Sequence, residues 1–232
     1  MNASAANVDL LERVAARLLH LRERVVFLGG ATTSLFVTDA ATPPMRPTDD
    51  VDVIVEVAST MEYKTTLRSE LLALGFAEDV EGPNCRWIVD GAKLDVMPVD
   101  EAVLGYTNEW YAAAIRAARP FTLPSGTVIR LVSATHFVAT KLAAFENRGD
   151  GDFEASPDIE DVMAVVDGRS ELAAEAKAAA ADLRRYLGER FARLLANPRF
   201  NEALPGHLGY DGAGRLTTVN ARLQLLADLE RE

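Results

Sequence analysis

The sequence contains a single cysteine, Cys85, and this scarcity excludes an internal disulfide. None of its 3 histidines has a cysteine or a second histidine at zinc-ligand spacing, so a structural zinc site has no support. No apolar run approaches the ~20 residues that a membrane span requires. Residues 1–24 also lack the basic start, apolar stretch and cleavage site of a signal peptide. We therefore expect a cytoplasmic protein with no membrane segment, in a reducing compartment.

Basic residues are outnumbered as well. The 232 residues include 24 Lys+Arg against 35 Asp+Glu, a net charge of −11, so no general positive field is available to attract nucleic acid. A nucleic-acid partner would need a local basic patch, and its binding would weaken with salt. One basic segment contains Arg184, Arg185, Arg190 and Arg193. These arginines either form such a patch or lie on the solvated face of a helix.

The pattern of apolar residues divides the chain into two parts, and its length suffices for two modest domains. Residues 1–132 mix strand and helix patterns, whereas residues 133–232 are alanine-rich and helical. In the first part we expect helices at 11–21, 31–37 and 61–74, strands at 25–28 and 51–57, and hairpins at 86–97 and 121–131. In the second we expect helices at 134–147, 158–166, 171–195 and 217–229. The fold class is thus α+β (mixed α/β), a small mixed sheet followed by a helical domain.

Two glycines follow the first expected strand directly. Val25-Val26-Phe27-Leu28 runs into Gly29-Gly30, and such a pair is often a plain turn. A glycine turn after a buried strand can also present backbone N–H groups to a phosphate at the start of the next helix. The position of this pair favours phosphate binding.

Carboxylates recur on the neighbouring strands. Asp50 and Asp52 are two residues apart on one strand and therefore share a face of the sheet, whereas Asp49 points to the other face. Two like charges on one face repel unless a cation lies between them, so we interpret the pair as a Mg²⁺ site. Taken by itself, Asp95 is interpreted as a surface residue of the hairpin. On an adjacent strand it completes a three-carboxylate cluster that can hold two Mg²⁺ ions, with Asp95 helping to deprotonate an acceptor hydroxyl.

A glycine pair after a strand, then Asp-x-Asp, then a lone Asp on a later strand resembles the nucleotidyltransferase fold of the DNA polymerase β superfamily. Within it, Gly29-Gly30, Arg46-Pro47-Thr48-Asp49-Asp50-Val51-Asp52 and the helix near Lys141 look most like the AbiEii-type nucleotidyltransferases, toxins of type IV toxin–antitoxin systems. The resemblance covers Val25 to Asp167. It implies a Mg²⁺-dependent enzyme that uses an NTP, modifies tRNA or another cellular target, and is restrained by a separately encoded antitoxin.

The second half of that family supplies a lysine, an arginine about two turns later and an Asp-x-x-Asp on the next helix. Lys141, Arg148, Asp158 and Asp161 match these positions. Lys141 and Arg148 are seven residues apart and share a helix face, so both could reach triphosphate oxygens; the alternative is two surface cations on an amphipathic helix. The resemblance implies structural or nucleotide-positioning roles for both aspartates. Two departures are the long spacer from Gly30 to Asp50 and the proline, Pro157, at a position that is often basic.

Alternatives remain for the residues and for the function. Two acids in the first turn of a helix also suit the helix dipole without any ligand. Transfer to a small cationic molecule, as in aminoglycoside-modifying relatives of the fold, suits an acidic protein. A nucleotide-binding regulatory module without turnover is the third hypothesis. The aromatic residues Trp87, Trp110 and Tyr111 are expected in the core; the alternative is that they and Arg86 stack on a base or hold an acceptor.

Overall fold

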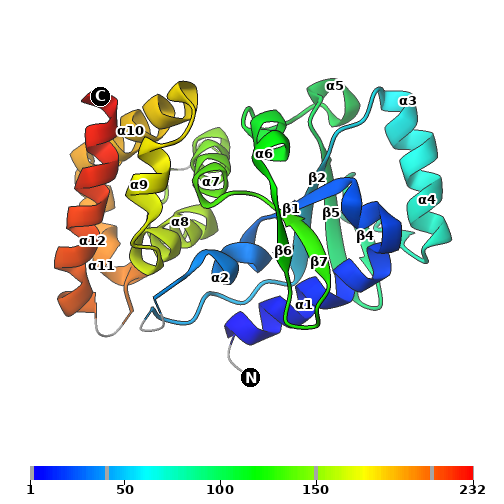
Figure 1. The fold of residues 1–232 in the computed structure, drawn as a ribbon, viewed down its shortest axis with the longest axis horizontal. Helices are drawn as coiled ribbons and strands as arrows, with labels where there is room; N and C mark the ends of the chain where they lie inside the picture. Colours follow the sequence, from blue (N-terminus) through cyan, green and yellow to red (C-terminus); the bar gives the residue numbers. More distant parts are fainter. Residues whose placement is uncertain (1–2, 40–41, 149–150, 210–211, 232) are drawn as a thin grey trace. The chain divides into compact units, whose positions relative to one another are not determined.

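The chain forms two compact units, which we describe separately (Figure 1). A computed structural model describes residues 3–39, 42–148, 151–209 and 212–231. The first unit consists of Met1–Ser34 and Arg46–Ser133, and the second of Leu35–Met45 and Ala134–Glu232. The short segment 35–45 therefore belongs with the helical half of the chain, although it lies among the strands in sequence.

The described part of the first unit contains one sheet of seven strands, in the order β3-β4-β5-β2-β1-β7-β6. The sheet is mixed, because β2 is antiparallel to β1 and parallel to β5, and β1 is parallel to β7. Its strands are β1 Val25–Leu28, β2 Asp50–Val55, β3 Ala77–Glu78, β4 Arg86–Val89, β5 Ala92–Pro98, β6 Arg119–Thr122 and β7 Val128–Leu131. The predicted small mixed sheet and both predicted hairpins are confirmed.

The turn between β4 and β5 determines which residues of the two strands face each other. Asp90 has φ +48° and Gly91 φ +74°, the positive values at both central residues that a two-residue hairpin turn of type I′ requires. This turn pairs Val89 with Ala92, and the register continues to the pair Arg86 and Asp95.

Helices of the first unit cover the sheet. In α1 the residues Leu11, Val14 and Leu18 are almost fully buried and pack toward β2 and β5, as their helical spacing predicts. The helical segments are α1 Ala3–Leu18, η1 Leu19–Glu23, η2 Gly30–Thr32, α3 Thr60–Glu62, η3 Tyr63–Leu67, α4 Arg68–Ala73, α5 Glu101–Leu104 and α6 Tyr111–Ala117.

The helix predicted at 31–37 is present, but it is short and begins as a 3₁₀ turn. A 3₁₀ turn, η2, comes first, and only one α-helical turn follows, α2 Thr33–Phe36. The backbone N–H of Thr32 donates to the Gly29 carbonyl at 3.0 Å, and the Thr32 hydroxyl donates to the same oxygen at 2.8 Å. Two donors on the carbonyl three residues back favour the tighter 3₁₀ turn over an α-helix.

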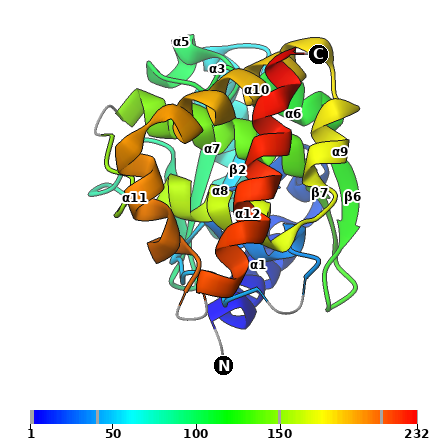
Figure 2. The same ribbon diagram turned by 90° about the vertical axis from the view of Figure 1, so that its left-hand side faces the viewer.

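The described part of the second unit is helical (Figure 2). Its core includes Phe137, Phe191 and Phe200, all fully buried. Segment 35–45 joins it through the Thr38 backbone N–H, which donates to the Gly168 carbonyl at 2.8 Å. The helices are α7 Ala134–Arg148, α8 Pro157–Gly168, α9 Leu172–Lys177, α10 Ala181–Ala196, α11 Pro198–His207, α12 Gly212–Ala227 and η4 Asp228–Arg231.

The continuous helix predicted at 171–195 is wrong. The chain breaks between α9 and α10, where Ala180 adopts an extended ψ of 146°. Alanine is the best helix former, so local propensity predicts no break there. Burial of Ala176 on one helix and of Leu183 and Leu187 on the other indicates that packing of two separate helices overrides propensity.

None of the helices in the described ranges combines the length and the apolar character that crossing a bilayer demands.

Candidate functional site

The first part of the candidate site is the turn after β1. Gly29 has φ +79° and ψ −176°, a backbone region that essentially only glycine occupies. A Cβ on Gly29 would lie 1.8 Å from the Asp52 Oδ2 atom. Both the conformation and the space therefore require glycine here. The glycine turn and the carboxylate strand therefore lie directly against each other.

Strand β2 carries Asp50 and Asp52. Both side chains are partly exposed, whereas Val51 and Val53 between and after them are fully buried. The Thr48 hydroxyl donates to Asp50 Oδ1 at 2.7 Å and so orients that carboxylate. Asp52 is opposite Leu28 of β1 and opposite Asp95 of β5, which places it where three neighbouring strands meet.

Asp49 lies away from this pair, as alternation predicts. Its carboxylate is 2.6 Å from Lys93 Nζ and is largely exposed. The hydrogen bond from Lys93 lowers the pKa of the Asp49 carboxyl below its ordinary value. Asp49 is therefore a surface ion-pair partner and provides a control position for the two carboxylates beside it.

Asn7 of α1 holds the segment that leads into β2. This buried side chain donates to the Arg46 carbonyl at 2.9 Å and accepts from the Thr48 backbone N–H at 3.1 Å. Because Thr48 in turn orients Asp50, the amide of Asn7 supports the carboxylate pair from behind. Sequence reasoning missed this role, since a lone asparagine in a helical pattern carries no signal of a distant partner.

Asp95 has a partner that sequence reasoning also missed. Arg86 donates through Nε to Asp95 Oδ1 at 2.8 Å and through Nη2 to Asp95 Oδ2 at 2.7 Å. The same Nη2 lies 3.2 Å from Asp50 Oδ2. The Asp95 carboxylate raises the pKa of the Arg86 guanidinium above its ordinary value, and Asp50 adds to this effect. The hairpin signal at Asp90-Gly91 was sufficient to find this pair, because a two-residue turn places residues 86 and 95 opposite each other.

A buried thiol and a phenol lie near the carboxylates. Burial raises the pKa of the Cys85 thiol above its ordinary value, while a hydrogen bond from Tyr106 opposes that change. The negative charges of Asp95 and Asp52 raise the same pKa further. Burial and these charges therefore favour the neutral form of the Cys85 thiol.

The second unit brings together the four charged residues predicted on α7 and α8, which are Lys141, Arg148, Asp158 and Asp161. Lys141 Nζ lies 3.2 Å from Asp158 Oδ1 and 2.7 Å from Asp161 Oδ2, and both aspartates are 2 % exposed. Arg148 Nη1 is 2.8 Å from Asp158 Oδ2, as an ionic contact rather than an aligned hydrogen bond. The ammonium also lies 5.9 Å from the centre of the Phe137 ring. Lys141 is therefore the central cation of a buried ion cluster.

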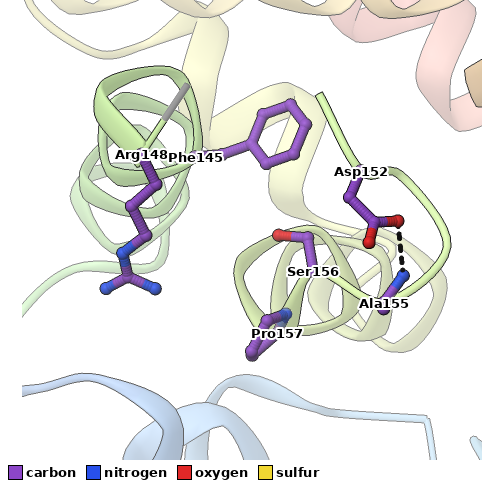
Figure 3. A pocket seen from close by; sticks show the side chains of 6 residues that line it. All are labelled: Phe145, Arg148, Asp152, Ala155, Ser156 and Pro157. Carbon is purple, nitrogen blue, oxygen red and sulfur yellow. Dashed lines mark hydrogen bonds between the residues drawn. The ribbon is translucent and has the colours of Figure 1, made fainter. Parts of the chain in front are cut away.

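Helix α8 begins at this cluster in the predicted way. Ser156 is the N-cap and accepts from the Ile159 backbone N–H, and Pro157 occupies the first helical position. A pocket of about 140 Å³ lies beside this end. Figure 3 shows Arg148 and Phe145 on one side of it, and Asp152 accepting from the Ala155 N–H on the other. The pocket lining is Phe145, Arg148, Asp152, Ala155, Ser156 and Pro157.

The remaining sequence candidates divide into core and surface. Trp87, Trp110 and Tyr111 are buried, which confirms the core interpretation. In the basic segment, Arg190 lies over the Tyr186 ring and pairs with Glu146 at 3.0 Å. Arg185 is mostly exposed, 3.9 Å from Glu189. Two of the four arginines of the basic segment therefore lie beside acidic side chains.

The first unit supplies two of the carboxylate ligands that a divalent cation would need. Asp50 and Asp52 supply two carboxylates on one face, and Mg²⁺ typically uses one or two carboxylates together with phosphate oxygens. Across the ranges that the structure describes, no group of three or more His, Cys, Asp or Glu side chains is arranged to hold a metal ion. The arrangement matches a two-carboxylate site better than the expected three-carboxylate cluster.

Comparison with known proteins supports the fold. No protein-family model matches the chain. No curated protein matches it either. Among solved structures, the crystal structure of an antigenic nucleotidyltransferase-like protein from Paracoccidioides brasiliensis is similar, with a TM-score of 0.53 and 18 % sequence identity, over 88 % of this chain and 94 % of the other. At that identity the likeness concerns the backbone alone. This likeness shows that the chain shares its backbone fold with that nucleotidyltransferase-like protein.

Proposed function

We propose that the protein is a Mg²⁺-dependent nucleotidyltransferase that transfers a nucleoside monophosphate from an NTP to an acceptor hydroxyl. The observation that carries the proposal is the contact between the Gly29 turn and Asp52, because it joins an anion-binding backbone to a cation-binding carboxylate. A triphosphate with its counter-ion needs both within the same few ångströms. The fold adds support, since a nucleotidyltransferase-like protein shares it.

Asp50 and Asp52 are the residues that would hold Mg²⁺. When bound, the ion neutralises charge on the triphosphate oxygens. The start of this turn, from Gly29 to Ala31, is the part that would present backbone N–H groups to the triphosphate, because the Thr32 N–H already donates to the Gly29 carbonyl. Because Gly29 has no Cβ, the Asp52 carboxylate can lie directly against the backbone of this turn.

Asp95 belongs to the acceptor side of the proposed reaction. The acceptor oxygen forms a bond to the α-phosphorus, the bond from that phosphorus to the β-bridging oxygen breaks, and pyrophosphate leaves. The Asp95 carboxylate accepts the hydroxyl proton, since a carboxylate has about four lone-pair sites and Arg86 uses two of them. Arg86 keeps this carboxylate oriented while the proton moves.

The acceptor follows from the resemblance rather than from the geometry. The first candidate acceptor is tRNA or another cellular macromolecule, which the protein would modify as a toxin restrained by a separate antitoxin. The net charge of −11 favours a small cationic acceptor as the second candidate. In both cases the NTP donates the nucleoside monophosphate, and the two candidates differ only in the molecule that receives it.

The test is a transfer assay with matched variants. The protein is incubated with Mg²⁺, a bacterial lysate and each NTP labelled at the α-phosphate. We expect label in an acceptor with the wild type and with Asp49→Asn, and a loss of about a hundredfold with Asp52→Asn. Digestion by nuclease or protease then assigns the label to RNA, protein or a small molecule. Equal labelling by Asp52→Asn and wild type would refute the carboxylate site. An absence of label with every NTP would favour a nucleotide-binding module without turnover.

A further inference from the structure

The Arg86–Asp95 pair has the geometry of a permanent ion pair. Two nitrogens of the guanidinium face the two oxygens of the carboxylate at 2.8 and 2.7 Å, the bidentate arrangement that gives the strongest charge-assisted hydrogen bonds. Both side chains are shielded from solvent, with 18 % of Arg86 and 11 % of Asp95 exposed. Screening by water is therefore weak at this pair.

The backbone holds the two residues opposite each other. They are direct cross-strand partners in the β4–β5 hairpin, whose register is set by the turn at Asp90-Gly91. The stem of Arg86 passes close to the backbone of Gly82, where an added Cβ would lie 3.1 Å from Arg86 Cδ. A guanidinium positioned by strand register has little freedom to leave its carboxylate.

The link from Arg86 to Asp50 is weaker. It consists of one hydrogen bond of 3.2 Å from the nitrogen that already serves Asp95. The other oxygen of Asp50 accepts from the Thr48 hydroxyl. A cation that binds Asp50 competes with this single long bond, whereas a cation that binds Asp95 competes with two short bonds from the guanidinium charge.

We infer that Arg86 is the resident counter-ion of Asp95, so that Asp95 lies outside the metal-ligand set and the site takes one divalent cation, through Asp50 and Asp52. This inference rests on the proposed function and specifies its metal site. Arg86 is a positioning residue: its charge disfavours a second dication next to Asp95 by repulsion at short range. The absence of a three-member ligand group among the described side chains agrees with this reading.

The test measures Mn²⁺ binding by electron paramagnetic resonance of the free ion, with a non-hydrolysable NTP analogue present. We expect one Mn²⁺ per wild-type chain. Asp52→Asn should weaken binding about tenfold or more, while Asp95→Asn and the control Asp49→Asn should stay within about threefold of wild type. Arg86→Gln should bind a second Mn²⁺, because it leaves Asp95 without its cation. Arg86→Lys, which keeps the charge, should bind one.

Each result decides the inference. Two ions per wild-type chain, or equal losses in Asp95→Asn and Asp52→Asn, would overturn it while leaving the nucleotidyltransferase proposal intact. An absence of bound Mn²⁺ in the wild type would overturn both. If circular dichroism shows that Arg86→Gln does not fold, the comparison of Asp95→Asn with Asp52→Asn still decides.

Discussion

Gly29 and Asp52 are in such close contact that the hydrogen of the glycine is the largest substituent the carboxylate permits. The first prediction concerns this contact. Gly29→Ala should lower the free energy of unfolding by about 3 kcal/mol, because it combines a forbidden backbone conformation with a clash against Asp52. Transfer activity should fall with it. Thermal denaturation measures the change.

The control for that variant is Gly75→Ala. Gly75 has a similar φ of +86°, but a Cβ there would have nothing within 4 Å. It should cost only the left-handed strain, about 1 kcal/mol. Equal costs for the two alanine variants would show that the Asp52 contact adds nothing.

Removal of the Asn7 amide should weaken the support of Asp50. Asn7→Ala leaves the Arg46 carbonyl and the Thr48 N–H without their buried partner, which costs about 1–3 kcal/mol. Activity should fall more than stability explains, since Thr48 orients Asp50. Asn220→Ala, at an exposed helix position, is the matched control and should change neither quantity. Full activity of Asn7→Ala at a temperature where it is folded would contradict the prediction.

Lys141 should be essential for the fold of the second unit. Lys141→Met leaves two carboxylates with 3 % and 2 % exposed side chains beside an apolar neighbour, and breaking such a buried pair costs about 3–5 kcal/mol. Lys64→Met, on an exposed helical surface, should change stability little. Urea denaturation measures both variants. Combination with Asp161→Asn should recover part of the loss; a further loss in the double variant would refute the pairing.

Alkaline pH should destabilise the protein through Tyr63. Its buried hydroxyl donates to the Val96 carbonyl at 2.7 Å, and burial raises the pKa of the phenol above its ordinary value. Above pH ~10 the unfolded chain has lost this proton and the folded chain retains it, so the unfolded state binds fewer protons. The free energy of unfolding then falls as pH rises, by about 1.4 kcal/mol per pH unit for this group.

The measurement is urea denaturation at increasing pH, in wild type and in Tyr63→Phe. Below pH ~10 the phenol is protonated in both states and contributes no slope. Burial also raises the pKa of Cys85, which has the same sign, so both proteins should carry Cys85→Ala. An unchanged alkaline slope in Tyr63→Phe would refute the assignment.

Local sequence signals were sufficient for most of the sheet. The apolar run Val25–Leu28 and the Asp90-Gly91 turn each specify a strand or hairpin within a few residues, and both are present. The split of α9 from α10 was not predictable, because alanine on both sides of the break gives no local preference against a helix. Membership of segment 35–45 in the second unit depends on contacts 130 residues apart, such as Thr38 with Gly168.

The candidate site shows the same division. Alternation placed Asp50 and Asp52 on one face and Asp49 on the other, since side-chain direction follows from strand geometry. The two hydrogen bonds of Asn7 form only because α1 packs behind β2, and no local sequence pattern predicts that packing. The pairing of Arg86 with Asp95 could have been predicted from the sequence, because the hairpin turn sets the register of the two strands. The partners of Lys141 depend on how α7 packs against α8.

The place of β2 in the middle of the sheet has a consequence for how the candidate site behaves in time. Strands with neighbours on both sides open to solvent only when most of the domain unfolds, and their amides are accordingly the slowest to exchange hydrogen. Asp52 and Asp95 lie on two such adjacent strands, β2 and β5. The backbone positions of these two residues are therefore expected to stay fixed until most of the unit unfolds, so that any opening of the candidate site would come from the surrounding loops and from side-chain rotation.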